Sequence, residues 1–360
     1  MKAVLLTGIR QMKLADVPEP AIEKDDDVLL KIEMVGVCGS DVHYYETGGI
    51  GSQVVEYPFI VGHECAATVK AVGGAVARVK VGDEIVVEPA VACHECDQCR
   101  QARENTCRNL RFLGTPGEGN GCLCEYIVMP EECCFPTNGA ITLEQAVCCE
   151  PFAIGVYAVK RAQMLNPARI TGGVKNAKIA ILGSGSIGLS CMAAAKAQDA
   201  EGFPQSGVPI YMTDKVQERL QVAKNAGAAW VGNPEKQDIV KLILQRQPLG
   251  IDVVYECAGQ QETLDEAVEL LRPGGALILI GAPRFERVSF VIDKMRRKEI
   301  TLVNIRRQNG CTQRAIDLIA SGEVNIDFMI THKFKLEQTQ DAFCLVAEYR
   351  DGVVKALIEL

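Results

Sequence analysis

Four cysteines fall within fifteen residues of this 360-residue chain, at a spacing that suits a metal site. The sequence reads Cys93-x2-Cys96-x2-Cys99-x7-Cys107. Four thiolates this close together can surround one zinc ion tetrahedrally and leave it no open position, which is how zinc holds a long loop in place. The spacing therefore predicts a structural zinc site. The alternative is four unrelated free thiols, and His94 inside the loop is expected to take no part.

A second set of possible metal ligands is dispersed along the chain. It comprises Cys38, the pair His63-Glu64, and Glu150 directly before Pro151. Together they offer soft, borderline and hard ligands for zinc, with room at the metal for water or a substrate. Each residue also has an ordinary structural interpretation, because a cysteine beside a glycine often packs in a core and Glu150 could start a helix. Spacing alone leaves both interpretations open.

A glycine-rich turn in the second half of the chain has the pattern of a dinucleotide site. The run Gly183-Ser184-Gly185-Ser186-Ile187-Gly188 follows an apolar predicted strand and opens a predicted helix, which is the context that this motif requires. Its glycines allow a tight turn, and backbone N–H groups and the helix N-terminus can then reach a pyrophosphate. A glycine-rich turn without a ligand is the alternative.

Asp214 supplies the acid that such a site needs at the end of the next strand. Its carboxylate would bind the adenosine ribose diol and repel a 2′-phosphate, so we expect NAD rather than NADP. Asp214 follows Gly188 by 26 residues, and a predicted surface loop at 199–209 accounts for the long spacing. Lys215 and Arg219 offer cations nearby that could weaken the preference for NAD.

The elements that position these residues differ between the two halves of the chain. Residues 1–150 are rich in Val, Ile and Thr runs broken by Gly, Pro and Asp, which predicts short strands. From about 150 to 300, apolar strands alternate with amphipathic helices, which predicts a parallel sheet covered on both faces. We expect strands at 178–182, 210–213, 251–256 and 275–280, and helices at 186–198, 216–226, 262–271 and 313–321.

The composition is that of an ordinary globular protein, with 48% hydrophobic and 23% charged residues and a formal net charge of −8. No apolar run is long enough to span a membrane, and the apolar start is too short for a signal peptide. The acidic balance argues against nucleic acid or an anionic membrane as a partner. The 16 cysteines are too sparse for a disulfide scaffold, so we expect mostly free thiols and a cytoplasmic protein.

Taken together, these motifs resemble the zinc-containing medium-chain dehydrogenases, and within them the sorbitol (polyol) dehydrogenases, over essentially the whole chain. The most specific stretches are Val35-Gly36-Val37-Cys38-Gly39-Ser40-Asp41-Val42-His43-Tyr44-Tyr45, Gly62-His63-Glu64, Glu150-Pro151, Glu256-Cys257-Ala258-Gly259 and Asn304-Ile305-Arg306. The resemblance implies an α/β protein of two domains. A β-rich, GroES-like catalytic domain is expected at 1–152 and 305–360, and a doubly wound, parallel-sheet Rossmann domain at 153–304.

The resemblance also implies roles for individual residues. Cys38, His63 and Glu64 would hold a catalytic zinc, and Glu150 would bind it either directly or through a water molecule. Ser40 and His43 would form a proton relay. The expected cofactor contacts are Gly183, Gly185, Ile187, Gly188, Asp214, Arg219, Ile280, Gly281, Ala282, Asn304, Ile305 and Arg306. The expected substrate positions are Tyr44, Phe112, Glu150, Arg306 and Arg307.

These roles predict an enzyme with two zinc ions per chain that oxidises a secondary alcohol of a polyol or sugar derivative to a ketone with NAD+. The zinc would act as a Lewis acid on the alcohol, and a hydroxyl such as that of Ser40 can both accept and donate the proton. The family implies a homodimer or homotetramer. The alternatives are a threonine-dehydrogenase-like enzyme, a sugar- or polyol-phosphate dehydrogenase, and a non-catalytic zinc- and dinucleotide-binding protein.

The pair Arg306-Arg307 departs from the sorbitol dehydrogenases, which carry a tyrosine after the pocket arginine. A second arginine would suit a substrate with a phosphate or carboxylate, because arginine pairs such groups in a bidentate way. Neighbouring residues of a strand face opposite sides, however, so Arg307 could instead point to solvent or to a subunit interface. Neutral polyols therefore remain the first expectation.

Overall fold

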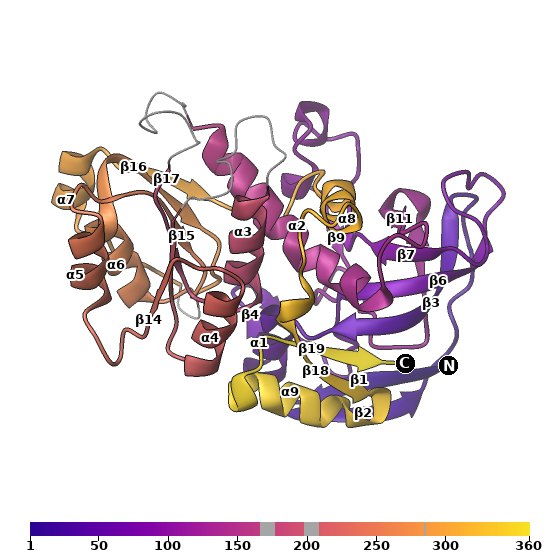
Figure 1. The fold of residues 1–360 in the computed structure, drawn as a ribbon. Coiled ribbons are helices and arrows are strands. Elements are labelled where there is room, and N and C mark those ends of the chain that lie inside the picture. The colour runs from indigo at the N-terminus through magenta and orange to yellow at the C-terminus, as the bar shows by residue number, and fades with distance from the viewer. Residues whose placement is uncertain (166–176, 198–208, 284–285) are drawn as a thin grey trace. The chain divides into compact units, whose positions relative to one another are not determined.

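The computed structural model describes residues 1–165, 177–197, 209–283 and 286–360 (Figure 1). These residues divide into two compact units. Unit 1 comprises Met1–Glu150, Thr312–Ala320 and Ile330–Leu360, and unit 2 comprises Pro151–Cys311 and Ser321–Met329. One division falls within helix α2 (Leu143–Gln163). The domain boundaries expected from the sequence, after residues 152 and 304, stay a prediction.

Unit 1 is built on a largely antiparallel sheet. In the described part of the unit, the strands lie in the order β11-β7-β6-β3-β19-β18, and β10 also pairs with β3. Both β6 and β19 run antiparallel to β3, whereas β18 and β19 are parallel. The strands are β3 (Asp27–Gly36), β6 (Glu64–Val72), β7 (Glu84–Val87), β10 (Tyr126–Pro130), β11 (Cys134–Pro136), β18 (Ile330–Lys335) and β19 (Lys355–Glu359).

Short strand pairs and helices complete unit 1. The pairs are β1 (Lys2–Gly8) with β2 (Gln11–Asp16), β4 (Gly49–Ile50) with β5 (Gln53–Val54), and β8 (Ala90–Val91) with β9 (Arg111–Phe112); the helices are α1 (Gly39–Thr47), α8 (Thr312–Ala320) and α9 (Thr339–Ala347). Inward-facing residues such as Leu30, Ile32 and Ile85 form the core, and the ring of Tyr45 packs on that of Phe343 at 5.5 Å. This core anchors the strand ends that carry the predicted metal ligands.

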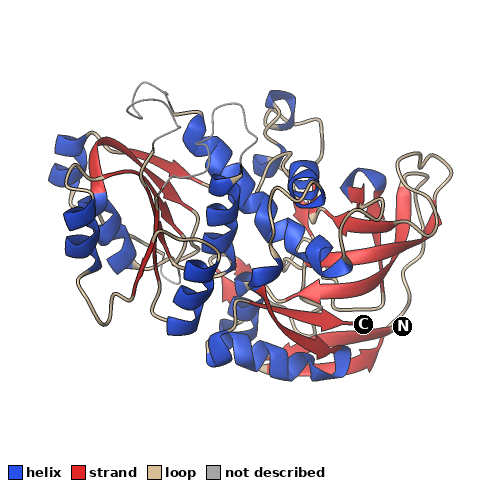
Figure 2. Cartoon of the chain, in the orientation of Figure 1, coloured by secondary structure: helices blue, strands red, loops and turns tan. Residues whose placement is uncertain are grey.

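Unit 2 contains a parallel sheet. Its described strands lie in the order β14-β13-β12-β15-β16-β17, the arrangement of a doubly wound dinucleotide-binding fold. Helices cover both faces of this sheet (Figure 2). The elements are β12 (Ile179–Leu182), α3 (Ser186–Lys196), β13 (Ile210–Thr213), α4 (Gln217–Asn225), β14 (Trp230–Gly232), α5 (Ile239–Arg246), β15 (Ile251–Glu256), α6 (Gln261–Leu270), β16 (Leu271–Leu279), α7 (Ile292–Lys298) and β17 (Thr301–Asn304).

The predicted fold class is confirmed, since a β-rich unit accompanies a parallel, doubly wound sheet. The predicted strands at 210–213 and 251–256 coincide with β13 and β15, while β16 begins four residues earlier than the expected 275. In unit 2, strands β14 and β17 and helices α5 and α7 were not predicted from the sequence. Apart from Pro209, the loop expected at 199–209 lies outside the described residues. No helix in the described chain has the length and apolar character needed to cross a membrane.

The turn between β12 and α3 depends on two of its glycines. Gly183 has a φ of +104°, a backbone conformation that side chains disfavour. Gly188 lies in α3 where an added Cβ would overlap the carbonyl oxygen of Gly183. Only a glycine at 188 therefore lets the helix start this close to the end of β12. A Cβ at Gly185, by contrast, would meet the Arg219 guanidinium at an ordinary 3.6 Å.

We expect Gly188→Ala to lower the free energy of unfolding by about 1–3 kcal/mol, because the methyl group must displace backbone atoms. Gly185→Ala is the matched control and should leave stability almost unchanged. Urea unfolding of the two variants, followed by circular dichroism, measures the difference. Equal stabilities would show that the close approach of α3 to β12 is not what requires Gly188.

Candidate functional site

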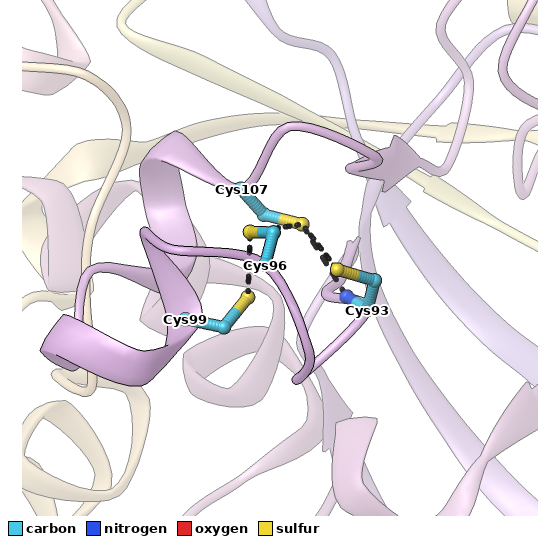
Figure 3. Close-up of side chains that lie close together, drawn as sticks. All are labelled: Cys93, Cys96, Cys99 and Cys107. Atoms are coloured by element: carbon cyan, nitrogen blue, oxygen red, sulfur yellow. Dashed lines mark hydrogen bonds between the residues drawn. The ribbon is translucent and has the colours of Figure 1, made fainter.

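The loop that carries four cysteines is closed at its base and brings the sulfur atoms together. Strands β8 and β9 pair antiparallel, with Ala90 opposite Phe112, so both ends of the loop are fixed. The sulfur–sulfur distances are 3.5 Å for Cys96–Cys99, 3.9 Å for Cys96–Cys107 and 3.4 Å for Cys93–Cys107 (Figure 3). Tetrahedral zinc with Zn–S bonds of about 2.3 Å needs sulfur atoms about 3.8 Å apart. The donor set therefore fits a closed zinc site.

Backbone groups of this loop already favour thiolates. N–H groups of Arg108 and Cys99 hold the pKa of Cys96 down at about 6, and that of Glu95 lowers the pKa of Cys93. Burial, with neighbouring sulfur atoms, raises the pKa of Cys99 to about 12. A metal ion must therefore displace the Cys99 proton, and metal affinity is expected to rise with pH. His94 lies outside the group, with Nε2 2.8 Å from a carboxylate oxygen of Glu132.

A second group forms where strands of the main sheet of unit 1 begin and end. Cys38 follows β3, and His63 and Glu64 stand at the start of β6; because the strands are antiparallel, Gly36 lies directly opposite Glu64. The ligand atoms of Cys38, His63 and Glu64 all lie within 4.8 Å of one another. A side chain at Gly36 would overlap the Glu64 carboxylate. This set of sulfur, nitrogen and oxygen donors fits zinc with an open position.

Asp41 orients the histidine of this group. Its fully buried carboxylate lies 3.2 Å from His63 Nδ1 and accepts the backbone N–H groups of Gly62 at 3.3 Å and Cys38 at 3.4 Å. A carboxylate on Nδ1 leaves Nε2 available for a metal. Burial lowers the pKa of His63, but Asp41 and Cys38 together raise it well above its usual value. No role for Asp41 was predicted from the sequence, although an acid three residues after Cys38 was a usable signal.

The residues expected to relay protons, and two of the expected substrate positions, lie on α1 and β9. The hydroxyl of Ser40 donates to Cys38 Sγ at 3.3 Å, and His43 lies one turn further along the same helix. The buried ring of Phe112 lies 5.3 Å from the ring of His63. Tyr44 is buried, and its hydroxyl donates to Gln53 at 3.2 Å. The structure thus brings Ser40 and Phe112 directly to the metal-ligand group.

A buried lysine that the sequence analysis missed contacts Glu64. Lys355, the first residue of β19, places Nζ 2.5 Å from Oε2 and 2.8 Å from Oε1 of Glu64, with both side chains almost fully buried. It also donates to the carbonyl of Val37 at 3.2 Å. Burial lowers the pKa of Lys355, but Glu64 and Cys38 raise it above its ordinary value. A single lysine in the apolar run 353–358 was the available signal.

Glu150 is a buried carboxyl with an orphaned oxygen. It lies within α2 rather than at a helix start, and its Oε2 has no hydrogen-bond partner among the described residues. Burial, with the charges of Glu64 and Glu88, raises its pKa to about 8, and His63 opposes the shift. Glu150 is not one of the three residues whose ligand atoms lie within 4.8 Å in the described chain. Its free oxygen fits either a metal ion or a metal-bound water.

In unit 2, the predicted cofactor residues follow the carboxyl ends of parallel strands, which share one edge of the sheet. Asp214, directly after β13, accepts the backbone N–H of Ser184 at 2.7 Å and that of Val216 at 2.8 Å. Its carboxylate therefore lies beside the glycine turn, as an acid on an adenosine ribose must. The Arg219 guanidinium lies next to the same turn, near Gly185.

The remaining predicted cofactor segments lie at this edge too. The carbonyl of Glu256, at the end of β15, accepts the N–H groups of Ile280 and Gly281, each at 2.9 Å, and Ile305 donates to Leu279 at 2.9 Å. Gly281 packs so closely on Gly259 that an added Cβ would overlap it. Residues 280–282 thus follow β16, and residues 304–306 start at the last residue of the adjacent strand β17.

Arg306 and Arg307 do not lie on a strand, so the expected alternation of their side chains does not apply. Strand β17 ends at Asn304. Arg306 is exposed, and Arg307 is half-buried with a φ of +53°. The left-handed backbone at Arg307, rather than the pleat of a strand, sets the direction of its side chain.

Family models match both halves of the chain: the alcohol dehydrogenase GroES-like domain at residues 24–139, and the zinc-binding dehydrogenase domain at residues 186–321. The sorbitol dehydrogenase of Bacillus subtilis is 36% identical over 99% of this chain and 97% of its own length. D-xylulose reductase A of Aspergillus oryzae is 32% identical over 94% of this chain and 91% of its own length. The chain therefore belongs to the zinc-binding medium-chain alcohol and polyol dehydrogenases, which are NAD(P)-dependent oxidoreductases.

Solved structures agree with this assignment. An Escherichia coli oxidoreductase of unknown specificity has a TM-score of 0.89 and 30% identity, covering 99% of this chain and 98% of its own. A zinc-binding dehydrogenase of Sinorhizobium meliloti, bound to NADP, has a TM-score of 0.86 and 28% identity, covering 100% and 99%. An Escherichia coli alcohol dehydrogenase, complexed with NADH, has a TM-score of 0.85 and 25% identity, covering 100% and 99%.

The two metal-ligand groups should respond differently to mutation. We expect Cys99→Ser to lose one zinc per chain and to lower the free energy of unfolding by roughly 2–5 kcal/mol, because metal binding contributes to folding at a closed site. Cys38→Ser should lose the other zinc and turnover while its melting temperature changes little. Metal analysis and calorimetry of both variants test this. Unchanged stability of Cys99→Ser would contradict a structural role for the loop.

The buried Glu150 should make the metal-free protein sensitive to pH. Because its folded-state pKa is raised from an ordinary 4.5 to about 8, its stabilising contribution is complete below pH 4.5 and is lost as the pH rises through 8. Metal-free Glu150→Gln should therefore be more stable than the metal-free wild type above pH 8, by about 1–3 kcal/mol, and no more stable below pH 5. Unfolding curves of both metal-free proteins across this range provide the measurement. If the free energies of unfolding of the two proteins changed with pH in parallel, the raised pKa of Glu150 would be contradicted.

Proposed function

We propose that this protein is a zinc-dependent polyol dehydrogenase that oxidises a secondary alcohol to a ketone with NAD+. The observation that carries the proposal is the Cys38, His63 and Glu64 group with a serine hydroxyl at 3.3 Å from Cys38 Sγ, in a chain that also has the acid and glycine turn of a dinucleotide site. The two curated relatives named above carry the names of polyol-converting enzymes. A protein that merely bound zinc and a dinucleotide would have no use for a relay hydroxyl.

The residues of unit 1 would divide the chemistry among them. Cys38, His63 and Glu64 would hold a zinc ion, which would supply a Lewis acid that lowers the pKa of an alcohol. Ser40 would accept the hydroxyl proton and pass it towards His43, because a hydroxyl both accepts and donates. Asp41 would keep His63 in the required tautomer, and Phe112 would shield that imidazole from water. Glu150, with its free oxygen, would orient either a water molecule or a second substrate hydroxyl.

In unit 2, Asp214 would decide the choice of cofactor. Its carboxylate accepts two backbone N–H groups beside the glycine turn, which leaves its charge close to where a 2′-phosphate would sit and so favours NAD. Arg219 competes with this preference, because a guanidinium beside Gly185 could pair with that phosphate. We give NAD precedence because the acid is fixed by backbone groups.

Two finer features extend the proposal. The Arg306-Arg307 pair favours, as a second candidate, a substrate that carries a phosphate or carboxylate.

Strand β17 is the outermost strand of its sheet. A second copy of the chain could extend the sheet at this edge, so a homodimer or homotetramer is proposed.

A substrate panel tests the function. Zinc-loaded protein is mixed with NAD+ or NADP+ and with neutral polyols, polyol phosphates, sugar acids and threonine, and NAD(P)H absorbance is followed. We expect turnover of a neutral polyol with NAD+, and Asp214→Ala should bring the kcat/KM values for NAD+ and NADP+ to within about tenfold of each other. Arg307→Tyr, matched to the sorbitol-type residue, should change the ranking only if an anionic substrate is preferred.

Three results would reject parts of this proposal. The absence of turnover with every alcohol at full zinc loading would favour a binding protein. Threonine as the best substrate would favour a threonine-dehydrogenase-like enzyme. Wild-type use of NADP+ at least as good as that of NAD+ would show that Arg219, not Asp214, sets the preference.

A further inference from the structure

Lys355 is a buried cation whose position is hard to explain by stability. It stands in β19 between the buried residues Val354 and Ala356, and its side chain is 3% exposed. Removing an ammonium and a carboxylate from water costs free energy that their mutual attraction often fails to recover, so replacing both members of such a pair by apolar side chains of similar size is often neutral or stabilising. The lysine therefore points to a role at the neighbouring metal-ligand group.

The strand order of the sheet places Lys355 beside the group formed by Cys38, His63 and Glu64. Since β19 runs antiparallel to β3, its first residue lies near the end of β3, where Val37 N donates to Ala356 O at 2.9 Å. Strand β6 lies on the other side of β3 and begins with Glu64. Gly36 separates the two without a side chain, so the Glu64 carboxylate crosses β3 and meets Nζ with both oxygens.

The charges of the metal-ligand group indicate what the contact between Lys355 and Glu64 does. With Cys38 as a thiolate and Glu64 as a carboxylate, the two anionic ligands neutralise a metal ion of charge two, and His63 binds a metal as a neutral imidazole. Two full anionic ligands weaken a divalent ion as a Lewis acid. Lys355 adds one positive charge in direct contact with the Glu64 carboxylate, which draws part of its negative charge away from the metal.

We propose that Lys355 is a positioning residue for the catalytic metal: it holds Glu64 by both oxygens and shares its charge, so that the metal binds Glu64 weakly and stays acidic. The inference rests on the proposed function in one respect, that the Cys38, His63 and Glu64 group binds the catalytic zinc. A purely structural lysine would hold Glu64 in place for the metal, and its loss would weaken metal binding. A charge-sharing lysine has the opposite effect.

Metal affinity and a spectrum test the proposal. The variant Lys355→Met removes the charge and keeps the length of the side chain, Lys355→Arg keeps the charge, and Lys333→Met removes an exposed lysine of neighbouring β18 that pairs with Glu144. In the full chain with its four-cysteine site filled, zinc affinity of the second site is measured by chelator competition, and Co2+ replaces zinc there for its visible absorption bands.

We expect Lys355→Met to bind zinc at the second site about tenfold more tightly or better, because removing a nearby cation favours a divalent ion, and to shift the Co2+ bands. Lys355→Arg should restore wild-type affinity and bands, and Lys333→Met should match the wild type. Equal or weaker zinc binding by Lys355→Met, or failure of Lys355→Arg to restore the wild-type values, would overturn the proposal.

A second comparison covers the case in which Lys355→Met does not fold. Glu64→Gln leaves Lys355 without its anion, whereas the double variant Glu64→Gln/Lys355→Met removes both charges. We expect the double variant to bind zinc more tightly than Glu64→Gln, and equal or weaker binding would overturn the proposal. Wild-type protein with a single zinc per chain would refute the proposed function as well, whereas two zinc ions with no effect of Lys355 would refute this inference alone.

Discussion

The antiparallel pairing of β3 with β6 on one side and β19 on the other is the constraint on which the metal-binding chemistry of unit 1 depends. Antiparallel neighbours place the end of one strand beside the start of the next, so Cys38 meets Glu64 and Lys355 although they are far apart in sequence. Gly36 completes the arrangement, because any side chain there would occupy the place of the Glu64 carboxylate. The core of unit 1 thus fixes the ligands before any metal arrives, and a preset ligand geometry is what an open catalytic site requires.

In the four-cysteine loop the dependence is the other way round, because there a bound metal would help to hold the fold of the loop. Between the β8–β9 pair at its base, the loop has short 3₁₀ turns at Cys99–Gln101 and Glu104–Thr106 and few apolar residues. Its order therefore depends on the sulfur atoms and on what they bind. Backbone N–H groups that lower the pKa values of Cys93 and Cys96 prepare the thiolates, and the buried Cys99 completes the set. One chain thus contains a metal site that the fold builds and another that helps to build the fold.

The parts of this structure that the sequence predicted are those in which the signal is local. The four cysteines lie in one loop, the glycine turn follows a continuous apolar strand, and β13 and β15 are short runs with clear ends. Helix α5 was missed although Asp238 caps it by accepting the Lys241 N–H at 2.9 Å, and β14 has three residues, too few for a period. The dispersed ligand group came from family resemblance. The contact of Lys355 with Glu64 could not be predicted, because the two residues are 291 positions apart in the sequence. The pairing of β19 with β3 that brings them together is a feature of the tertiary structure.

The same distinction explains why the choice between NAD and NADP is harder to predict from the sequence than the binding of a dinucleotide. Binding requires a turn of the right shape, and the close approach of Gly188 to Gly183 sets that shape in the backbone. We propose that the choice depends on the balance between the Asp214 carboxylate and the Arg219 guanidinium, which lie beside the same turn. Backbone N–H groups hold the Asp214 carboxylate in place there. A fixed anion at this position would repel a 2′-phosphate, and this repulsion is our reason for proposing NAD as the preferred cofactor.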